Sequence, residues 1–466
     1  MPNFKHMKNL FKFQTLILLT VLSILILSTT KCNSPYTDSI KVGVFEVNVT
    51  PPIGSPVAYA TTRSIVDSLT AKGIVILSDE KPVVLCAVDW IGIGNEGQDA
   101  WRESLAEAAG TTTDRVSVHT VHQHDGCRCD LTTERIIAKY GLGGWRHDTL
   151  FIQNTIKSVA LALQNAKQNA QPVTHLGFAE AKVEKVASNR RILGEDGNVE
   201  IVRYSSTKNP AAIAAPEGLI DPWLKCVSFW KDDQPIAILN YYATHPMSHY
   251  GKGDVSSDFA GIARDTRERQ LGVPNIYFSG AGGNITAGKY NDGSPERRAV
   301  LAGRMETAMR QAWELTEKVP LSKSDIEWRN VETLLPVRKT LVEEELIALL
   351  EDPQLDSLKK YSAADQLAWL RRTKSGHKVN ISTLKLGNVW LLNLPGETFV
   401  EYQLAAQKMK PEGHVCTAAY EEYGPGYICT EIAYSQDKGY EQLPRASYVA
   451  PEVENIMMTA MKQVLK

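Results

Sequence analysis

Three histidines lie within six positions of one another in the segment VSVHTVHQHDGCRCD, at His119, His122 and His124, although the chain has only ten. In an extended strand alternate side chains share a face, so His122 and His124 are expected to project together and His119 to face the other way. Two neighbouring imidazoles suit a metal ion, or a metal ion with a general acid or base. The alternative is a pair of ordinary hydrogen-bonded histidines, and this segment alone does not decide between the two.

A second candidate cluster lies in NYYATHPMSHYGKGDVSSDFAG, where an apolar strand ends at His245 and Pro246. The proline restricts the backbone beside His245, which favours a fixed metal ligand. His249 follows in a polar loop and is the weaker candidate. A helix capped by Ser257 or Asp258 is expected next.

Two further segments carry polar groups that could join these histidines. LNLPGETFVEY places Glu397 after a strand and a Pro-Gly turn, in the first turn of a helix, where a carboxylate also stabilises the helix dipole. YEEYGPGYICTEIAYSQDKGYE contains Tyr427 and Tyr440, which by themselves are typical of a surface loop. The glycines of IYFSGAGGNITAGKY lack the Lys-Ser/Thr pair of a P-loop and indicate a close backbone approach to a ligand or metal site.

The elements that must position these residues alternate between strands and helices. Strands are predicted over residues 41–50, 81–93, 115–122, 234–245, 274–280 and 388–396, and helices over 97–110, 147–168, 258–271 and 295–317. This alternation predicts an α/β fold with a mixed β-sheet core flanked by helices. The polar clusters fall where strands run into Gly or Pro turns, and open α/β sheets place their sites at such positions.

Residues 41–466 are expected to form a single large catalytic domain. Within it, residues 341–376 are rich in helix formers and interrupted by Pro353, which predicts an inserted helical hairpin. The hairpin could be a lid over the site or a packing element, and packing is favoured. The nearly balanced charge of −2, with no long block of either sign, excludes a nucleic-acid partner.

The first 35 residues resemble an export signal, with Lys5, Lys8 and Lys12 ahead of an apolar run too short for a comfortable membrane span. Cys32 lies where a bacterial lipoprotein would be acylated and anchored to the membrane, but Lys31 replaces the small residue expected before it. Lipid anchoring and simple secretion are equally favoured. The protein is therefore expected to be exported, as a periplasmic protein, an outer-membrane lipoprotein or a secreted protein.

Taken in order, the motifs resemble those of the neutral, non-lysosomal ceramidases. The resemblance runs from about residue 41 to the end of the chain, and any one motif alone would be weak. The matching segments are FEVNVTPPIGSP with the family's strand and ITPP turn, HTVHQHDG with THTHSGP, ASNRR with NRS, YATHPMS with HPTS, GAGGNITAG in the place of GDVSPN, LPGET with PGE, and GYICT followed by GYE with the Tyr-rich close.

The resemblance implies one catalytic zinc ion, Zn²⁺, which activates water for hydrolysis of an amide bond in an N-acylsphingosine-like lipid. Carried over motif by motif, the metal ligands are His122, His245, Glu397 and Tyr427.

It also implies the residues that act on the substrate. His124 would polarise the amide carbonyl or move protons, and Arg190 and Tyr440 would bind the carbonyl or the developing oxyanion. Thr286 replaces a serine of the family that could position substrate. The expected partner is thus a small-molecule or lipid substrate.

The chain departs from the family at several positions. Asn284 replaces an aspartate, and Asp125, Gly126 and Cys127 replace the SGP beside the paired histidines. The sequence ends after PEVENIMMTAMKQVLK, so the expected fold lacks the C-terminal immunoglobulin-like domain of the family. These differences leave two alternatives open: a zinc hydrolase of another exported amide or ester, derived from carbohydrate or the cell envelope, and a non-catalytic surface binding protein on the same fold.

The cysteines permit two arrangements near the site. One of Cys127 and Cys129 could pair with Cys429 in a disulfide, as an oxidising compartment allows, or all could be buried thiols. The two possibilities have equal weight.

Overall fold

The computed structural model describes residues 40–466, which form one compact unit. The expected export signal and Cys32 lie outside the described residues. Among residues 40–466, no helix combines the length and apolar character that crossing a bilayer requires.

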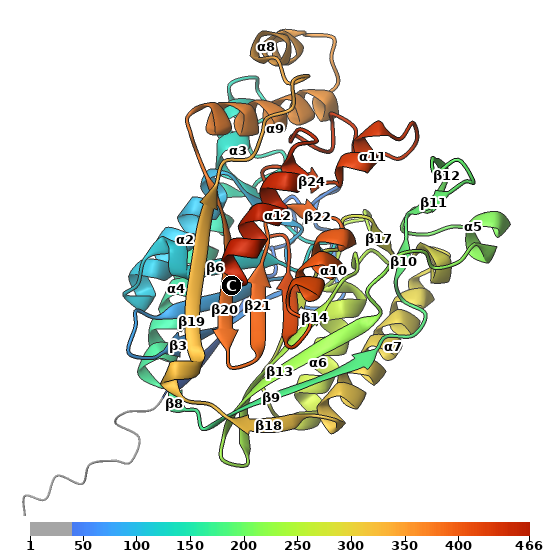
Figure 1. The fold of residues 1–466 in the computed structure, drawn as a ribbon. Coiled ribbons are helices and arrows are strands. Elements are labelled where there is room, and N and C mark those ends of the chain that lie inside the picture. The colour runs from blue at the N-terminus through green and yellow to red at the C-terminus, as the bar shows by residue number, and fades with distance from the viewer. Residues whose placement is uncertain (1–39) are drawn as a thin grey trace, which may run out of the picture. The chain divides into compact units, whose positions relative to one another are not determined.

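Three larger sheets form the core (Figure 1). The first has the spatial order β6 (Val116–Thr120), β4 (Val83–Val88), β3 (Thr70–Leu77), β1 (Lys41–Asn48) and β8 (Gln171–Pro172). The second has the order β16 (Asn275–Ser279), β14 (Gln234–Tyr242), β13 (Trp223–Lys231), β9 (His175–Lys182) and β18 (Glu317–Pro320). The third has the order β19 (Ile326–Thr333), β20 (Val379–Leu386), β21 (Val389–Asn393) and β23 (His414–Ala418).

Each sheet is antiparallel except for one parallel pair at its edge. The parallel pairs are β4 with β6, β14 with β16, and β21 with β23. A helix lies between the two strands of each pair along the chain, because parallel neighbours need a long crossover. These helices are α2 (Glu96–Ala109), α6 (Asp258–Leu271) and α10 (Val400–Met409). The three sheets therefore repeat one strand-helix-strand arrangement, and the carboxyl ends of these strands lead into the segments with the candidate residues.

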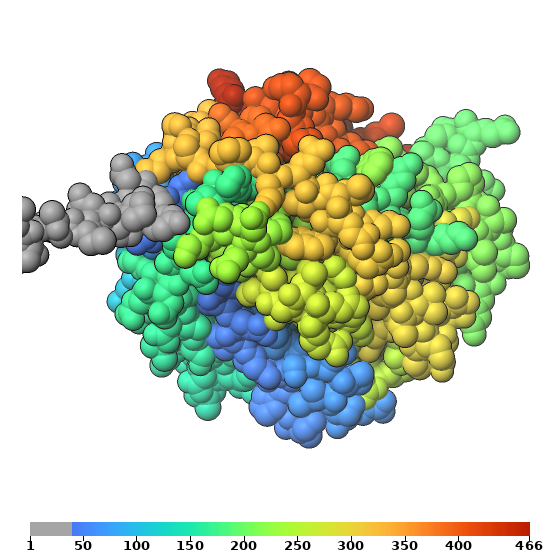
Figure 2. All heavy atoms as spheres, turned by 90° about the horizontal axis from the view of Figure 1, so that it is seen from below, coloured from blue at the N-terminus to red at the C-terminus, as the bar shows by residue number. Residues whose placement is uncertain are grey.

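Helices cover the sheets. α2 and α4 (Thr149–Gln168) pack on the first sheet, α6 and α7 (Pro295–Glu314) on the second, and α10 and α12 (Val453–Val464) on the third. Strands β16 and β23 contact each other, and β16 also contacts β4 and β6, so the parallel edges of the sheets meet in the interior. Seen from below, the blue N-terminal segments lie against green and yellow segments from the middle of the chain (Figure 2). The predicted mixed α/β architecture is confirmed.

Short strand pairs and helices complete the fold. The two-stranded pairs are β2 (Ser64–Ile65) with β15 (Asp254–Val255), β5 (Gly92–Gly94) with β7 (Arg128–Asp130), β10 (Ser188–Asn189) with β17 (Ile285–Thr286), β11 (Arg191–Leu193) with β12 (Val199–Val202), and β22 (Glu397–Thr398) with β24 (Tyr427–Ile428). The remaining α-helices are α3 (Leu131–Ala138), α5 (Pro210–Ala214), α8 (Glu343–Glu351), α9 (Ser357–Lys374) and α11 (Glu431–Ser435).

Several strands and helices end at other residues than the sequence predicted. β6 ends at Thr120, and His122 has a φ of 64°, so His122 and His124 do not share a strand face as the alternation argument assumed. β14 ends at Tyr242, which leaves His245 on the following loop. α7 stops at Glu314 because the chain from Glu317 pairs with β9 as strand β18.

The segment 341–376 is a helical hairpin of α8 and α9 between β19 and β20. Its Leu346, Leu350, Leu367 and Trp369 are buried in the core that surrounds the third sheet. Asp356 caps α9 by accepting a hydrogen bond from the Lys359 N–H. The hairpin is thus a packing element, and α9 also supplies part of a cavity wall.

Candidate metal centre and active site

His122, His124 and His245 come together in the interior. Potential ligand atoms of the three rings all lie within 4.8 Å of one another. His122 and His124 follow β6, and His245 follows β14, so two parallel edges supply the cluster. The Nε2 atoms of His122 and His124 are 3.4 Å apart, and the two rings meet edge to face.

Glu397 joins this cluster from the third sheet. It follows β21 and Gly396, whose φ of 61° provides the turn that a side chain would strain. Oε2 of Glu397 lies 2.9 Å from Nε2 of His245 and 3.2 Å from Nε2 of His122. All three side chains are buried. The parallel pair β22 and β24 places Tyr427 directly opposite Glu397.

The hydrogen bonds of the imidazoles indicate what this arrangement can bind. Nδ1 of His245 lies 2.6 Å from Gly282 O and 3.0 Å from Ile285 O, and Nδ1 of His122 contacts Ile91 O. Carbonyl oxygens accept hydrogen bonds, so each Nδ1 carries a proton, and Nε2 is the atom of each ring that can bind a metal ion.

Burial and the nearby charge of Arg190 lower the pKa of His245 to about 3, which keeps its ring neutral. Oε2 of Glu397 lies close to Nε2 of both rings in this buried site. A cation bound there would coordinate all three atoms.

Zinc fits this set of donors. Zn–N and Zn–O distances of 2.0–2.1 Å in a tetrahedron place neighbouring ligand atoms about 3.3 Å apart. The separations between Glu397 and the two histidines and between His122 and His124 run from 2.9 to 3.4 Å. His122 and His245 are each also oriented by a carbonyl on Nδ1, as zinc-binding histidines usually are.

The remaining expected ligand and its partners form a second group. Tyr427 Oη accepts a hydrogen bond from Nη1 of Arg190 at 3.1 Å and lies 3.2 Å from Oη of Tyr440. Nε and Nη2 of Arg190 have no hydrogen-bond partner within residues 40–466. Arg190 is fully buried, whereas Tyr427 and Tyr440 line a cavity. The structure therefore places Arg190 behind the two tyrosines.

Other residues singled out in the sequence lie apart from this site. The hydroxyl of Thr286 donates to Tyr204 O at 3.2 Å and does not line the cavity, and Asn284 accepts from the Val400 N–H at the start of α10. His119 faces away, as predicted, and bonds to Ala419 O and Asn393. His249 lies near Gly293 O and takes no part in the histidine cluster.

Tyrosines that sequence reasoning missed surround the cluster. Tyr423 donates to Oε1 of Glu397 at 3.0 Å, and Tyr59 Oη lies 2.8 Å from Nδ1 of His124. The ring of Tyr420 stacks on His122 with centroids 4.4 Å apart. Tyr420 and Tyr423 belong to the Tyr-rich segment, which was a usable signal. Tyr59 carries no such signal.

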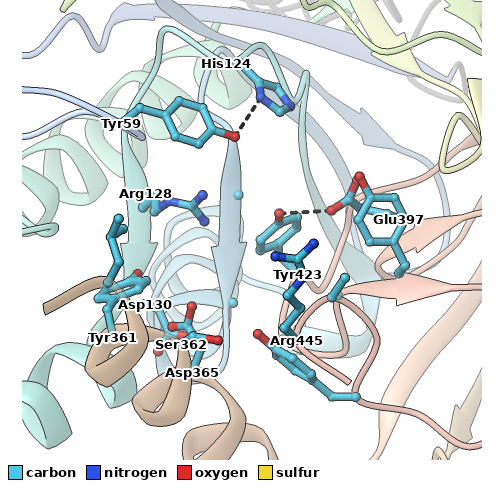
Figure 3. Close-up of a pocket in the computed structure, with 18 of the residues that line it drawn as sticks. Tyr59, His124, Arg128, Asp130, Tyr361, Ser362, Asp365, Glu397, Tyr423 and Arg445 are labelled. Atoms are coloured by element: carbon cyan, nitrogen blue, oxygen red, sulfur yellow. Dashed lines mark hydrogen bonds between the residues drawn. The ribbon is translucent and has the colours of Figure 1, made fainter. Parts of the chain in front are cut away.

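A cavity of about 550 Å³ opens beside the cluster (Figure 3). His124 and Glu397 reach its wall, and His122 and His245 lie behind them. Eight tyrosines line the cavity, whereas Met247 and Leu358 are its only large aliphatic residues. Aromatic and polar groups therefore dominate the surface that a substrate would meet.

Of the two arrangements left open for the cysteines, the disulfide is absent from the described residues. All six cysteines there are free and buried, and burial raises the pKa of Cys127, Cys129 and Cys429. Cys127 and Cys129 pack in the core of the first sheet, whereas Cys429 packs in that of the third. A disulfide between them is therefore wrong as a prediction, and the alternative of buried thiols is correct.

Comparisons with known proteins identify the fold. No protein-family model matches the chain, and no curated protein does. Two solved structures are similar: the neutral ceramidase from Pseudomonas aeruginosa, at 18% sequence identity, and a ceramidase complexed with C2, at 16% identity, each with a TM-score of 0.67. The matches cover 92% of this chain in both cases, and 74% and 75% of the respective ceramidase chains. The described chain therefore has the fold of the neutral ceramidases, as the order of its motifs predicted.

Proposed function

We propose that the protein is a zinc-dependent hydrolase of the neutral ceramidase type, which cleaves an amide bond with metal-activated water. The observation that carries this proposal is the contact of one buried Glu397 oxygen with Nε2 of both His122 and His245. These three residues are the proposed zinc ligands. His124 Nε2 and the hydroxyl of Tyr427 are candidates for the next position.

Zinc bound by these residues would act as a Lewis acid and lower the pKa of water to about 7. The zinc ion would lie between the Glu397 oxygen and the two facing Nε2 atoms and would coordinate all three. Tyr423 holds the second oxygen of Glu397 and so fixes the carboxylate. A carboxylate fixed in this way binds a metal ion more tightly than one that is free to rotate.

The residues on the cavity wall suit the proton transfers and the carbonyl. His124 lines the cavity and is oriented by Tyr59, so we assign it the proton-transfer role. Tyr427 and Tyr440 present hydroxyl groups that could donate to an amide oxygen, a contact worth about 3–4 kcal/mol for a well-placed donor in the transition state. Arg190 acts through them as a positioning residue, because it is buried and donates to Tyr427.

The cavity supports a second candidate within the same class. A lining dominated by tyrosines and charged groups suits a polar amide or ester better than the two alkyl chains of N-acylsphingosine. An amide derived from carbohydrate or the cell envelope is therefore the alternative substrate. A non-catalytic binding protein is the remaining alternative, and the complete set of zinc-binding side chains argues against it.

The proposed setting is outside the cytoplasm. The basic and apolar N-terminal segment supports export, and Cys32 is the candidate residue for lipid anchoring.

The test combines metal content with hydrolysis by the purified protein. Elemental analysis should find about one zinc per chain, and release of fatty acid from a short-chain ceramide should be lost on chelation and restored by zinc. Parallel assays use short acylated amino sugars and p-nitrophenyl esters to cover the alternative substrates. A folded protein that binds no zinc contradicts the metal assignment. A zinc-loaded protein that hydrolyses none of these compounds contradicts the enzyme.

A further inference from the structure

An arginine that no catalytic role explains points into the cavity. Arg128 lies on β7, which pairs in parallel with β5. In Figure 3 its guanidinium lies between Tyr59 on one side and Asp130 and Asp365 on the other, and it points into the cavity. Its Cζ is 5.9 Å from the centre of the Tyr59 ring. The side chain is half-buried, and its guanidinium has no hydrogen bond or ion pair with any residue of the described range.

The guanidinium reaches the cavity, and its five N–H donors have no protein partner within residues 40–466. An acceptor bound in the cavity would therefore pair with a charge that no described residue already holds. Asp130 accepts hydrogen bonds from other groups, namely from Thr133 N at 2.8 Å and from Asn95 Nδ2 at 2.6 Å. Burial raises the pKa of Asp130 to about 6, and burial together with Asp130 raises that of Asp365 to about 7. Both acids carry negative charge at neutral pH, but neither forms an ion pair with Arg128 among the described residues, so the fork of the guanidinium remains available to a ligand.

A second arginine lines the same cavity. Arg445 is exposed at the rim, and its side chain likewise has no hydrogen bond or ion pair with residues 40–466. Figure 3 shows Arg128 and Arg445 entering the cavity from different walls. Two guanidinium groups without protein partners in one pocket indicate an anionic ligand.

We infer that the substrate carries a carboxylate close to its scissile bond, and that Arg128, assisted by Arg445, holds this carboxylate. The inference rests on the proposed hydrolase function and narrows its substrate to an acylated amino acid or a related acidic amide. A carboxylate matches the planar fork of arginine, which can bind both oxygens. Asp130 and Asp365 next to Arg128 disfavour a doubly charged phosphate, because like charges at short range repel.

The position of Arg128 explains why the carboxylate lies near the reacting bond. The Tyr59 ring that Arg128 approaches carries the hydroxyl that bonds to His124. One aromatic ring thus separates the guanidinium from the proposed proton-transfer residue. A substrate held at Arg128 therefore reaches His124 past the Tyr59 ring, whose centre lies 5.9 Å from Arg128 Cζ and 5.6 Å from the centre of the His124 ring.

The test compares two ligands that differ only in charge. Butanesulfonylglycine and butanesulfonylglycinamide resist hydrolysis, since a sulfonamide replaces the amide, and their binding to the zinc-loaded protein is measured by calorimetry. The carboxylate is expected to bind at least about tenfold more tightly, as charged hydrogen bonds allow. Arg128→Gln should reduce the ratio at least severalfold, because only Arg445 would remain, and Arg128→Lys should retain more of it. A carboxylate bound only to zinc would keep its advantage in Arg128→Gln.

Arg310→Gln is the control. Arg310 pairs with Glu314 on α7 and does not line the cavity, so the ratio should not change. Equal binding of the two ligands, no binding of either, or an unchanged ratio in Arg128→Gln overturns the inference. A third ligand carries a phosphonate in place of the carboxylate of butanesulfonylglycine. If this ligand binds more tightly than the carboxylate, the site is a phosphate site and the inference is overturned. A carboxylate preference without hydrolysis of any acyl amino acid contradicts the proposed function and leaves the carboxylate site in place.

Discussion

The hydroxyl of Tyr423 donates to Oε1 of Glu397 over 3.0 Å, while Oε2 of the same carboxylate faces Nε2 of His245 at 2.9 Å. One carboxylate is therefore held from both sides, by a phenol on one oxygen and by the proposed metal position on the other. Tyr423 lies on the loop after β23, and Glu397 begins the short strand β22 that follows β21. The parallel edge of the third sheet brings the two residues together.

Tyr423→Phe should weaken zinc binding about 10- to 100-fold, since partners that orient a ligand have effects of that size. The change removes the hydroxyl that fixes Glu397 and preserves the ring. Competition with a chromophoric chelator measures the affinity. Tyr250→Phe is the control, because it removes a hydroxyl from the same cavity. The Tyr250 hydroxyl bonds to Ser205 rather than to Glu397. Equal affinities in the two variants would show that Tyr423 does not orient the ligand.

His245→Ala should abolish stoichiometric zinc binding, since it removes one of the two imidazoles that face Glu397. Elemental analysis of the dialysed protein provides the measurement. His249→Ala is matched to it, because His249 lies on the same loop, contacts Gly293 O and stays outside the cluster. Zinc lost from His249→Ala and retained by His245→Ala would reverse the assignment of the two histidines.

Arg264→Met should lower the free energy of unfolding by about 3–5 kcal/mol, the usual cost of leaving a buried charge unpaired. Arg264 makes two hydrogen bonds with Asp89, at 2.7 and 2.9 Å, and both residues are fully buried. Urea unfolding measures the change. Arg269→Met on the exposed side of α6 should change stability by less than about 0.5 kcal/mol. A small effect of Arg264→Met would mean that water reaches Asp89.

Glu421 makes stability depend on pH. Burial raises its pKa to about 7, whereas an unfolded glutamate titrates near 4.3. Between these values the unfolded chain has released the proton that the folded protein retains, so this group makes stability fall as pH rises. Between pH 4.5 and 7.5 the free energy of unfolding should therefore fall by about 1–3 kcal/mol less in Glu421→Gln than in the natural protein. Urea unfolding at both pH values tests this, with the exposed Glu344→Gln as a control that should follow the natural protein.

The sequence by itself determined the fold class and much of the candidate site. Alternating strands and helices predicted the mixed α/β architecture, because hydrophobic periodicity reports local structure directly. The order of the motifs identified four candidate site residues: His122, His124, His245 and Glu397. Each of them follows an apolar strand, and the carboxyl ends of such strands are where α/β sheets place their sites.

The tertiary structure decided what local patterns do not encode. His122 and His124 are in contact although they do not share a strand face, and the backbone of His122 is left-handed. Tyr59 and Tyr423 reach the site from segments far apart in the chain, and their roles depend on contacts that periodicity does not report. The separation of Cys429 from Cys127 and Cys129, and the unpaired Arg128 in the cavity, likewise follow from which cores and walls pack together. Such relationships depend on the meeting of three sheets, which no single segment specifies.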